Sequence, residues 1–418
     1  MNSKTKNIVK RLFKEYYSKN LNKIFIPKSF ANREFAFQPF TKQGMIRHLG
    51  FDKPEDLYNF LLENIPRHSY YSTAIYVLPS ARDMDEKGWL GAELVFDIDA
   101  DHINTPCKLE HDSWKCLNCG YQGKGPAPDK CPKCGSKNIK GFTWVCEKCI
   151  EAARNEIIKL IEGFLIPDLG FKPSDMLIAF SGHRGFHLHV LCDECLKLSS
   201  SERREIVDYV KGLGLSLETI LPPYKRRGEV AGIDLGEKGW RGKIAKKLFE
   251  KVSSLDESLE EIVGRRAFRK LLENSDKIIK EMTAETPKWT LLYRSLGSKG
   301  LLLLLTQKII DEIKCSVDEK VTIDTHRLIR LPGSLHGKTG LPVMVLRGIS
   351  DLERFELSDR LSPFKGEATI RLIEDLSRSL TIFSVAVGGK AGTKYKVSLP
   401  VALYLACREL AEIEEVER

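Results

Sequence analysis

Residues 176–191, MLIAFSGHRGFHLHVL, consist of two apolar stretches joined by Ser181-Gly182-His183-Arg184-Gly185. Apolar and aromatic runs of this length bounded by glycine predict two paired strands. The two glycines allow the backbone to turn tightly and to approach a ligand. Ser181, Arg184 and His187 would then offer a hydroxyl, a guanidinium and an imidazole to one spot, which suits a triphosphate. The alternative is a plain hairpin with a core histidine at position 187.

A third strand is predicted at ELVFDID, residues 93–99. Side chains alternate along a strand, so Asp97 and Asp99 share one face while Phe96 and Ile98 pack into the core. Two such carboxylates lie about 6.6 Å apart along the strand, close enough to bind one or two Mg²⁺ ions. The alternative is a strand end that carries two solvated aspartates.

The segment VTIDTHRLIRLPGSLHGKTGLPV, residues 321–343, carries the third set of chemical groups. We expect residues 321–324 to form a strand that ends at Asp324, which would supply a third carboxylate. Arg327, Arg330, His336 and Lys338 follow closely and would neutralise phosphates. The alternative is a basic loop on the surface.

The rest of the chain alternates predicted helices and strands, which indicates a mixed α/β (α+β) core. We expect strands at 73–79 and 341–347, and helices at 4–20, 152–164, 201–211 and, in the acidic tail, 404–418. A charge-rich helical pattern over 243–314 indicates an inserted helical subdomain. The predicted organisation is a core made of residues 1–106, 151–242 and 319–418, interrupted by a cysteine-rich segment at 107–150 and a helical insertion at 243–318.

Eleven cysteines include four C-x2-C pairs, a spacing that favours metal binding over disulfides inside a cell. Two pairs predict a zinc ribbon with the ligands Cys116, Cys119, Cys131 and Cys134. A second zinc site would combine Cys107, His111, Cys146 and Cys149. The alternative is that His111 is a surface residue and Cys107 a buried thiol. Cys192 and Cys195 are interpreted as structural thiols. Zinc held by four protein ligands has no open position for water, so both sites are expected to be structural.

The chain of 418 residues carries a net charge of +9, concentrated in two stretches. Residues 1–28 hold eight Lys/Arg and one Glu, and residues 222–247 hold eight basic and three acidic residues. Patches of this kind are expected to meet a polyanion, nucleic acid first of all, although they also occur on solvated helices and loops. The longest apolar run, Leu301 to Leu305, is too short to cross a membrane. The N-terminus lacks the features of a secretory signal, so we expect no membrane association and an intracellular location.

Taken together, these motifs resemble the small catalytic subunit of archaeal and eukaryotic DNA primases. The resemblance rests on FDID at 96–99, SGHRGFH at 181–187, KLSS at 197–200 and IDTHRLIRLPGSLHGKTG at 323–340. REFAF at 33–37 and Ile46-Arg47 resemble the N-terminal motif of that family. Cys107, His111, Cys146 and Cys149 lie where the family has a zinc knuckle. The chain departs from the family in two respects: the predicted ribbon lies inside this knuckle, between His111 and Cys146, and position 183 is His where eukaryotic relatives carry Arg.

The resemblance implies a primase-type catalytic domain with an RRM-like half. It also implies a nucleotidyltransferase that makes short RNA or DNA primers on single-stranded DNA. Asp97, Asp99 and Asp324 would bind two Mg²⁺ or Mn²⁺ ions. The residues expected to contact the triphosphate are Ser181, His183, Arg184, His187, Arg330, His336 and Arg47. Zinc would be a structural cofactor, and the substrates would be a DNA template and NTPs or dNTPs. The implied protein partners are an iron–sulfur large subunit, with which the chain would form a heterodimer, and the replicative polymerase and helicase. The implied location is an archaeal cytoplasm, or the nucleus of a eukaryote.

Two other functions fit parts of the sequence. A non-catalytic zinc-ribbon protein that binds nucleic acid would leave Asp97 and Asp99 without a role. An end-joining or repair polymerase related to primases would extend existing primers without starting new ones. The ability to start a chain separates the latter from a primase.

Overall fold

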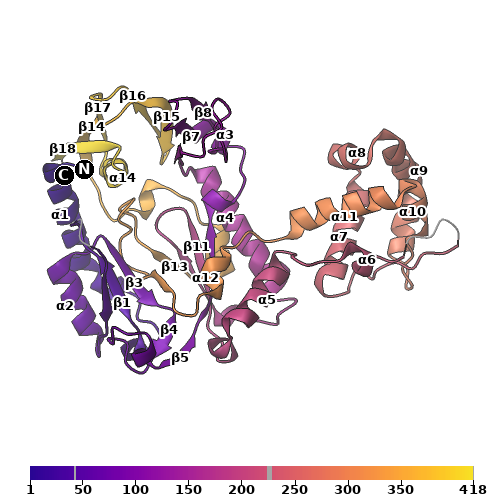
Figure 1. The fold of residues 1–418 in the computed structure, drawn as a ribbon, viewed down its shortest axis with the longest axis horizontal. Helices are drawn as coiled ribbons and strands as arrows, with labels where there is room; N and C mark the ends of the chain where they lie inside the picture. The colour runs from indigo at the N-terminus through magenta and orange to yellow at the C-terminus, as the bar shows by residue number, and fades with distance from the viewer. Residues whose placement is uncertain (42–43, 224–227, 418) are drawn as a thin grey trace. The chain divides into compact units, whose positions relative to one another are not determined.

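The computed structural model describes residues 1–41, 44–223 and 228–417, apart from the side chains of residues 377 and 378. The chain divides into two compact units. The first contains Met1–Ile158, Pro173–Arg204 and the chain from Val317 onward, and the second contains Lys159–Lys172 and Glu205–Ser316 (Figure 1). The predicted mixed α+β fold is confirmed.

Two four-stranded antiparallel sheets form the centre of the first unit. One has the order β12-β3-β1-β2 and the other β13-β10-β11-β6. The strands of the first are β1 (Phe35–Gln38), β2 (Ile46–Leu49), β3 (His68–Ser72) and β12 (Leu328–Arg330). The strands of the second are β6 (Leu94–Asp99), β10 (Met176–Phe180), β11 (Gly185–Val190) and β13 (Met344–Leu346). The second sheet therefore joins two motifs that are far apart in the sequence, because β6 pairs with β11 and sets His187 opposite Asp97.

The alternation predicted for β6 is visible in its burial. Leu94, Phe96 and Ile98 are fully buried, while Asp97 and Asp99 are partly exposed. Val95 lies on the same face as the two aspartates but is also buried, because it packs into the main apolar core of the unit. That face of β6 is therefore covered by the apolar core at Val95 and partly exposed at Asp97 and Asp99.

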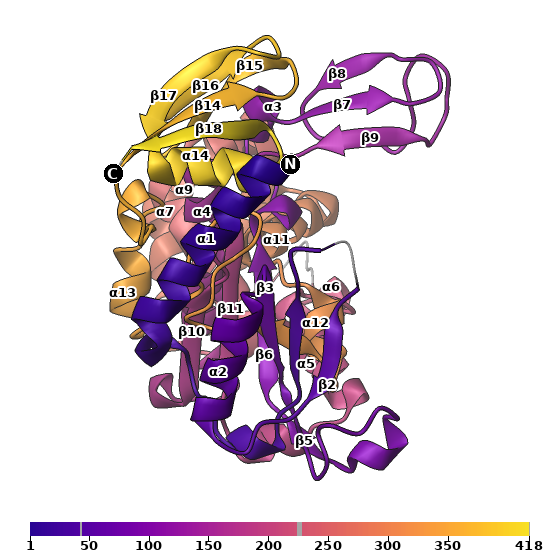
Figure 2. The ribbon, with the colours of Figure 1, turned by 90° about the vertical axis from the view of Figure 1, so that its left-hand side faces the viewer.

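The C-terminal part of the chain builds further sheets around one buried helix. α14 (Leu399–Cys407) is buried over its whole length, as its continuous apolar sequence requires. The strands around it are β14 (Glu367–Leu372), β15 (Leu376–Ile382), β16 (Val385–Gly389), β17 (Lys394–Ser398) and β18 (Ala411–Glu417). α1 (Ser3–Asn20) and β18 lie beside this helix (Figure 2), and the Ile413 N–H donates to the Thr5 hydroxyl of α1 at 3.1 Å.

The remaining elements of the first unit are short, apart from α2 (Pro54–Asn64). The hairpin of β4 (Ala74–Tyr76) and β5 (Trp89–Ala92) stands by itself, and a small three-stranded sheet with the order β8-β7-β9 carries the cysteine-rich segment. Its strands are β7 (Ser113–Cys116), β8 (Gln122–Lys124) and β9 (Ile139–Phe142). The other helices are α3 (Lys108–His111), α12 (Glu319–Ile323) and α13 (Ile349–Glu353).

Helices make up the second unit, as the charge-rich pattern predicts. They are α6 (Leu217–Ile220), α7 (Gly239–Ser254), α8 (Glu257–Val263), α9 (Arg265–Met282), α10 (Thr290–Leu296) and α11 (Lys299–Ile313). α4 (Glu147–Leu160) and α5 (Ser200–Val210) each have residues in both units. Residues 224–227 of the basic stretch 222–247 lie outside the described residues.

Three local predictions are wrong. Residues 321–324 do not form a strand, because Asp318 caps the start of a helix by accepting the Lys320 N–H, and α12 runs through this segment. The acidic tail is not one helix. α14 ends at Cys407, and residues 411–417 pair with β14 as β18, where apolar and acidic residues alternate in the manner of a strand.

The third wrong prediction concerns disulfides. Cys192 and Cys195 are bonded to each other, with their Cα atoms 5.2 Å apart. That separation lies in the usual range for a disulfide. The interpretation of Cys192 and Cys195 as structural thiols is therefore wrong, because the two residues form a disulfide.

Candidate functional site

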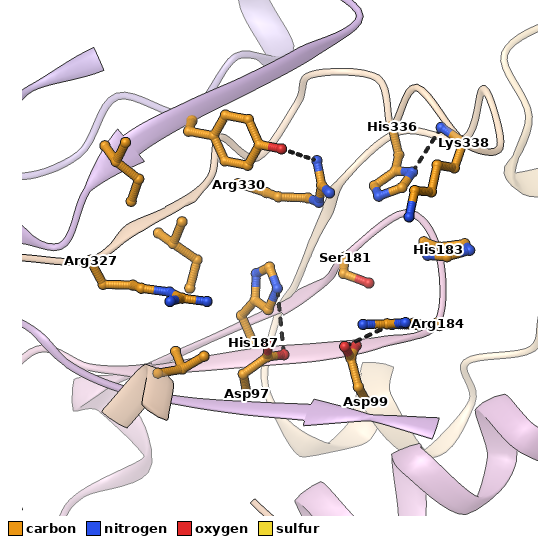
Figure 3. Close-up of a pocket in the computed structure, with 14 residues that line it drawn as sticks. Asp97, Asp99, Ser181, His183, Arg184, His187, Arg327, Arg330, His336 and Lys338 are labelled. Atoms are coloured by element: carbon orange, nitrogen blue, oxygen red, sulfur yellow. Dashed lines mark hydrogen bonds and ion pairs between the residues drawn. The ribbon is translucent and has the colours of Figure 1, made fainter. Parts of the chain in front are cut away.

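A cavity of about 190 Å³ lies where the two four-stranded sheets and the segment after α12 meet. Its lining includes Tyr70, Asp97, Asp99, Ser181, His183, Arg184, His187, Arg327, Arg330, His336 and Lys338. Of the residues that the sequence assigned to Mg²⁺ or Mn²⁺ or to the nucleotide, all but Asp324 and Arg47 line this cavity. Figure 3 shows the two aspartates on one side and Arg330, His336, Lys338 and His183 on the other.

The acidic side of the cavity is built for a cation. Burial raises the pKa of Asp97 well above its ordinary value, and the nearby carboxylates of Asp99 and Asp318 raise it further. Burial also raises the pKa of Asp99, against the opposing effect of Arg184. Within the described part of the chain, the buried Oδ1 of Asp97 accepts no hydrogen bond. Buried carboxylates that repel each other are relieved by a hard divalent cation, so the residues present fit Mg²⁺ or Mn²⁺.

Asp318 is a residue that the sequence reasoning missed. Its backbone N–H donates to the carbonyl of Asp97 at 2.9 Å, which fixes the start of α12 beside β6. Asp324, by contrast, is exposed beyond the C-terminal end of α12 and accepts the His326 N–H at 2.8 Å. The structure therefore does not bring Asp324 to the cavity. A cue was present in the sequence, since an aspartate before EKVTI is typical of a helix N-cap.

The opposite side of the cavity concentrates positive charge. Burial lowers the pKa of Lys338, and the cations of Arg184, Arg408 and Arg330 lower it further. The Arg330 guanidinium donates to His68 Nδ1 at 2.8 Å and lies 5.0 Å from the centre of the Tyr70 ring. Cations that raise each other's electrostatic energy in a partly enclosed space form a receptor for a polyanion.

Three histidines on this side are held neutral. Burial, with the neighbouring arginines, lowers the pKa of His68 to about 2 and that of His183 and His336 well below its ordinary value. The rings of His183 and His336 stack with their centres 4.9 Å apart. Arg408, a second residue that the sequence did not reveal, donates to His183 Nε2 at 2.9 Å. The ring nitrogens therefore serve as ordinary hydrogen-bonding groups around the cations.

The glycine-flanked loop has the form predicted for it. Gly182 has a φ of +77°, and a Cβ at this position would lie 2.9 Å from the Cβ of His336. Gly185 is required for another reason, because a Cβ there would lie 2.0 Å from the Ile98 carbonyl of β6. The loop thus approaches the neighbouring segments, and this closeness brings Arg184 to Asp99, with its Nε 2.8 Å from the carboxylate.

Arg47 lies elsewhere. Its Nε donates to Glu34 at 3.1 Å, and the same carboxylate forms an ion pair with the fully buried Lys87 at 3.2 Å. The structure therefore assigns Arg47 to a charge network on β1 and β2, outside the lining of the cavity.

The first cysteine cluster consists of Cys116, Cys119, Cys131 and Cys134, whose ligand atoms all lie within 4.8 Å of one another. The Sγ atoms of Cys116 and Cys134 are 3.6 Å apart, and those of Cys119 and Cys131 are 3.7 Å apart. Thiolates on one tetrahedral zinc ion are separated by about 3.8 Å, given Zn–S bonds of about 2.3 Å. This cluster could bind zinc.

The second cluster consists of Cys107, His111, Cys146 and Cys149. The Sγ of Cys149 lies 3.5 Å from that of Cys107, 3.7 Å from that of Cys146 and 3.3 Å from His111 Nε2. The other ring nitrogen of His111 lies 2.8 Å from the Asp112 carboxylate, an arrangement that orients histidine ligands in metal sites. The predicted set of four thus comes together, and it could also bind zinc.

Comparison with known proteins gives one consistent result. The family model described as DNA primase small subunit matches residues 129–349. The chain is 32% identical to the DNA primase small subunit PriS of Hyperthermus butylicus over 425 residues, which is 99% of this chain and 98% of the relative. It is 34% identical to the protein of the same name from Pyrobaculum arsenaticum (97% and 99% covered) and 31% identical to that from Saccharolobus solfataricus (99% and 97% covered).

Proposed function

This chain belongs to the DNA primase small subunit family, and from this membership we propose that it synthesises primers de novo on single-stranded DNA. Membership implies a nucleotidyltransferase-type polymerase. The observation that carries the proposal is the division of one cavity into a side of buried carboxylates and a side of cations. A nucleoside triphosphate with its divalent ions has the charges that complement both sides.

In this proposal Asp97, Asp99 and Asp318 hold two Mg²⁺ or Mn²⁺ ions. The ions would supply a lowered pKa for the attacking 3′-hydroxyl and neutralise charge on the phosphates. Asp318 takes the role that the resemblance implies for Asp324, because its backbone N–H donates to the Asp97 carbonyl and its charge acts on the Asp97 carboxylate.

Residues on the basic side of the cavity would position the nucleoside triphosphate. Ser181, Arg184, Arg330, His336 and Lys338 would bind the triphosphate, with the 3′-hydroxyl attacking the α-phosphate and pyrophosphate leaving. The Arg184 guanidinium is already paired with Asp99 and, through Nη1, with Asp101 at 2.6 Å. It therefore joins the acidic and basic sides, so binding of a triphosphate would exchange part of this pairing for phosphate oxygens.

The wider assignments follow from the family. The name small subunit implies a large-subunit partner, and we propose that an iron–sulfur large subunit, the template and the replication machinery act with this chain. We propose that the two cysteine clusters bind structural zinc and that the protein works in an archaeal cytoplasm, as its archaeal relatives suggest. In the part of the chain that the structure describes, no helix has the length and apolar character needed to cross a bilayer.

The test is primer synthesis by the full chain on circular single-stranded DNA with ribonucleotides or deoxynucleotides and Mg²⁺ or Mn²⁺. We expect new oligonucleotides from the wild type and none above background from Asp97→Asn. Product from Asp97→Asn at the wild-type rate would overturn the mechanism. A parallel reaction with an annealed primer separates a primase from a repair polymerase, since the latter would extend that primer but make nothing on the bare circle.

A further inference from the structure

An exposed aromatic surface adjoins the cavity on the side of Arg327. Arg327 lines the cavity, and the residue before it, His326, is exposed. The His326 ring lies 6.4 Å from the ring of Trp89 on β5, with an angle of 31° between the two planes. Two rings from distant parts of the sequence thus form one surface that continues from the lining of the cavity.

The Trp89 side chain is fixed but not buried. Its indole N–H donates to the Thr325 carbonyl at 3.2 Å, while 38% of its surface is exposed. The hydrogen bond satisfies the only polar atom of the indole, so what remains exposed is apolar ring. A large aromatic ring that is held in place at the surface offers a flat apolar face to a ligand.

His326 is fixed in a similar way. The Asp324 carboxylate accepts a hydrogen bond from the His326 backbone N–H at 2.8 Å. The centre of the His326 ring lies 6.2 Å from the ring centre of the buried Tyr76. This arrangement gives Asp324 a local role in shaping the turn that presents His326. The two exposed rings are therefore preorganised.

We propose that Trp89 and His326 form a stacking shelf for unpaired bases of the single-stranded template next to the nucleotide cavity; this inference rests on the proposed function. Bases of any identity stack on aromatic side chains, which suits an enzyme that must accept every template sequence. Arg327 joins the shelf to the cavity and provides a cation for the template backbone.

The charged residues around the β4–β5 hairpin indicate on which side of the two rings the DNA backbone lies. The tip that connects β4 and β5 carries three exposed carboxylates, Asp83, Asp85 and Glu86, against one exposed cation, Arg82, so its net charge is negative. These carboxylates repel phosphates, so the DNA backbone is expected on the side of Arg327, with its bases facing the rings. Exposed apolar residues on the same hairpin, Val77 and Leu90, are what a protein-docking surface would use instead, and the test distinguishes the two.

The test measures binding of the full chain to fluorescently labelled oligothymidine and to an abasic oligonucleotide of equal length, at one fixed salt concentration and without nucleotides. Removal of one aromatic ring on which a base stacks weakens binding by about fivefold to more than a hundredfold. We therefore expect Trp89→Ala to weaken oligothymidine binding about tenfold or more, with no change for the abasic strand. Trp89→Phe should retain most of the affinity, and His326→Ala should show a smaller loss of the same kind.

Leu90→Ala is the matched control, because Leu90 is the next residue on β5 and is 55% exposed. The proposal is overturned if Trp89→Ala binds oligothymidine as the wild type does, if it loses equal affinity for the abasic strand, or if Leu90→Ala has the same effect. Circular dichroism and thermal unfolding check that the variants fold. Asp97→Asn should still bind the oligonucleotide, so a failure of synthesis and a failure of stacking are separate results.

Discussion

The cysteine clusters and the cavity around Asp97 are both assembled from titratable side chains, but from different lengths of chain. All eight cluster ligands lie between residues 107 and 149, whereas the cavity is lined from Tyr70 to Lys338. The clusters follow from local spacing, since two C-x2-C turns already aim paired thiolates at one point. The cavity depends on strand pairing and on a capped helix. The difference teaches that a cluster of potential metal ligands can be predicted from spacing, while a site made by the fold cannot be fully predicted in this way.

The largest expected effect tests whether the two cysteine clusters are equivalent. Cys149 is fully buried, and the same segment carries Trp144, which is part of the core and donates to Asp112 and to the Thr381 carbonyl. Cys149→Ser should lower the free energy of unfolding by more than about 4 kcal/mol, as loss of a structural metal does. Cys131→Ser should unfold the small ribbon and leave the main thermal transition nearly unchanged.

Both variants are checked by zinc content and by calorimetry. Each should lose one of two zinc ions per chain. Equal shifts of the main transition would show that the ribbon is as deeply integrated as the second cluster, and an unchanged zinc content would remove the assignment of the mutated site.

The second effect is on catalysis and decides between two aspartates. Asp318→Asn should reduce primer synthesis about a thousandfold, equivalent to about 4 kcal/mol of transition-state stabilisation, as expected when a metal ligand is lost. Asparagine is also a good N-cap, so α12 should remain intact. Neither aspartate is among the residues that line the cavity. Asp324→Asn should stay within a few fold of the wild type, because Asp318 is hydrogen-bonded to the Asp97 backbone and its charge acts on the Asp97 carboxylate, whereas Asp324 is exposed beyond the end of α12. The measurement is the rate of primer formation, and the reverse order of the two variants would restore the assignment made from sequence.

The reason for the misplacement of the third carboxylate is physical. Apolar residues at 321 and 323 alternate as in a strand, but five residues cannot distinguish that period from one turn of helix. Asp318 decides the outcome by capping α12, and its role is evident only when β6 lies beside it. Asp97 and Asp99 were predictable, because the alternation within one strand places both on one face.

Other parts of the site also divide into residues that the local sequence predicts and residues that only the fold brings in. His187 and Ser181 were predictable from the loop that joins two apolar strands, and β10 and β11 have nearly the predicted bounds. Arg408 was not predictable, because it follows α14 and lies more than 200 residues along the chain from His183, which accepts its hydrogen bond. The C-terminal strand β18 was mistaken for a helix, since acidic residues at its exposed positions resemble a solvated helix face.

A third variant tests the positive side of the cavity alone. Arg330→Lys keeps the charge but loses the planar guanidinium, whose Nη1 donates to both His68 and Tyr70. We expect the KM for nucleoside triphosphate to rise about tenfold, the cost of one weakened charge-assisted contact, with a smaller change in kcat. The control is Arg360→Lys, an exposed arginine outside the cavity. An unchanged KM would show that Arg330 serves the fold and not the nucleotide.

The smallest effect is the pH dependence contributed by one histidine. In the folded protein His68 Nδ1 accepts hydrogen bonds from the Gly337 N–H and from Arg330, and burial lowers the pKa of His68 to about 2. In the unfolded chain a histidine takes up its proton near pH 6.5. Below that pH the unfolded chain binds a proton that the folded protein does not, so the free energy of unfolding falls as the pH falls, by about 1.4 kcal/mol per pH unit from this residue.

His68→Asn isolates this contribution, because the asparagine oxygen replaces the Nδ1 acceptor and takes up no proton. The cost of the substitution, measured by denaturant unfolding, should be constant near pH 8 and should shrink from pH 6 to pH 5, approaching about 1.4 kcal/mol per unit. Loss of zinc in acid affects both proteins alike and cancels in the difference, so the measurement reports on the cavity and not on the cysteine clusters. Parallel stability curves over that range would mean that His68 is protonated in the folded protein, and the neutral acceptor assigned here would then be wrong.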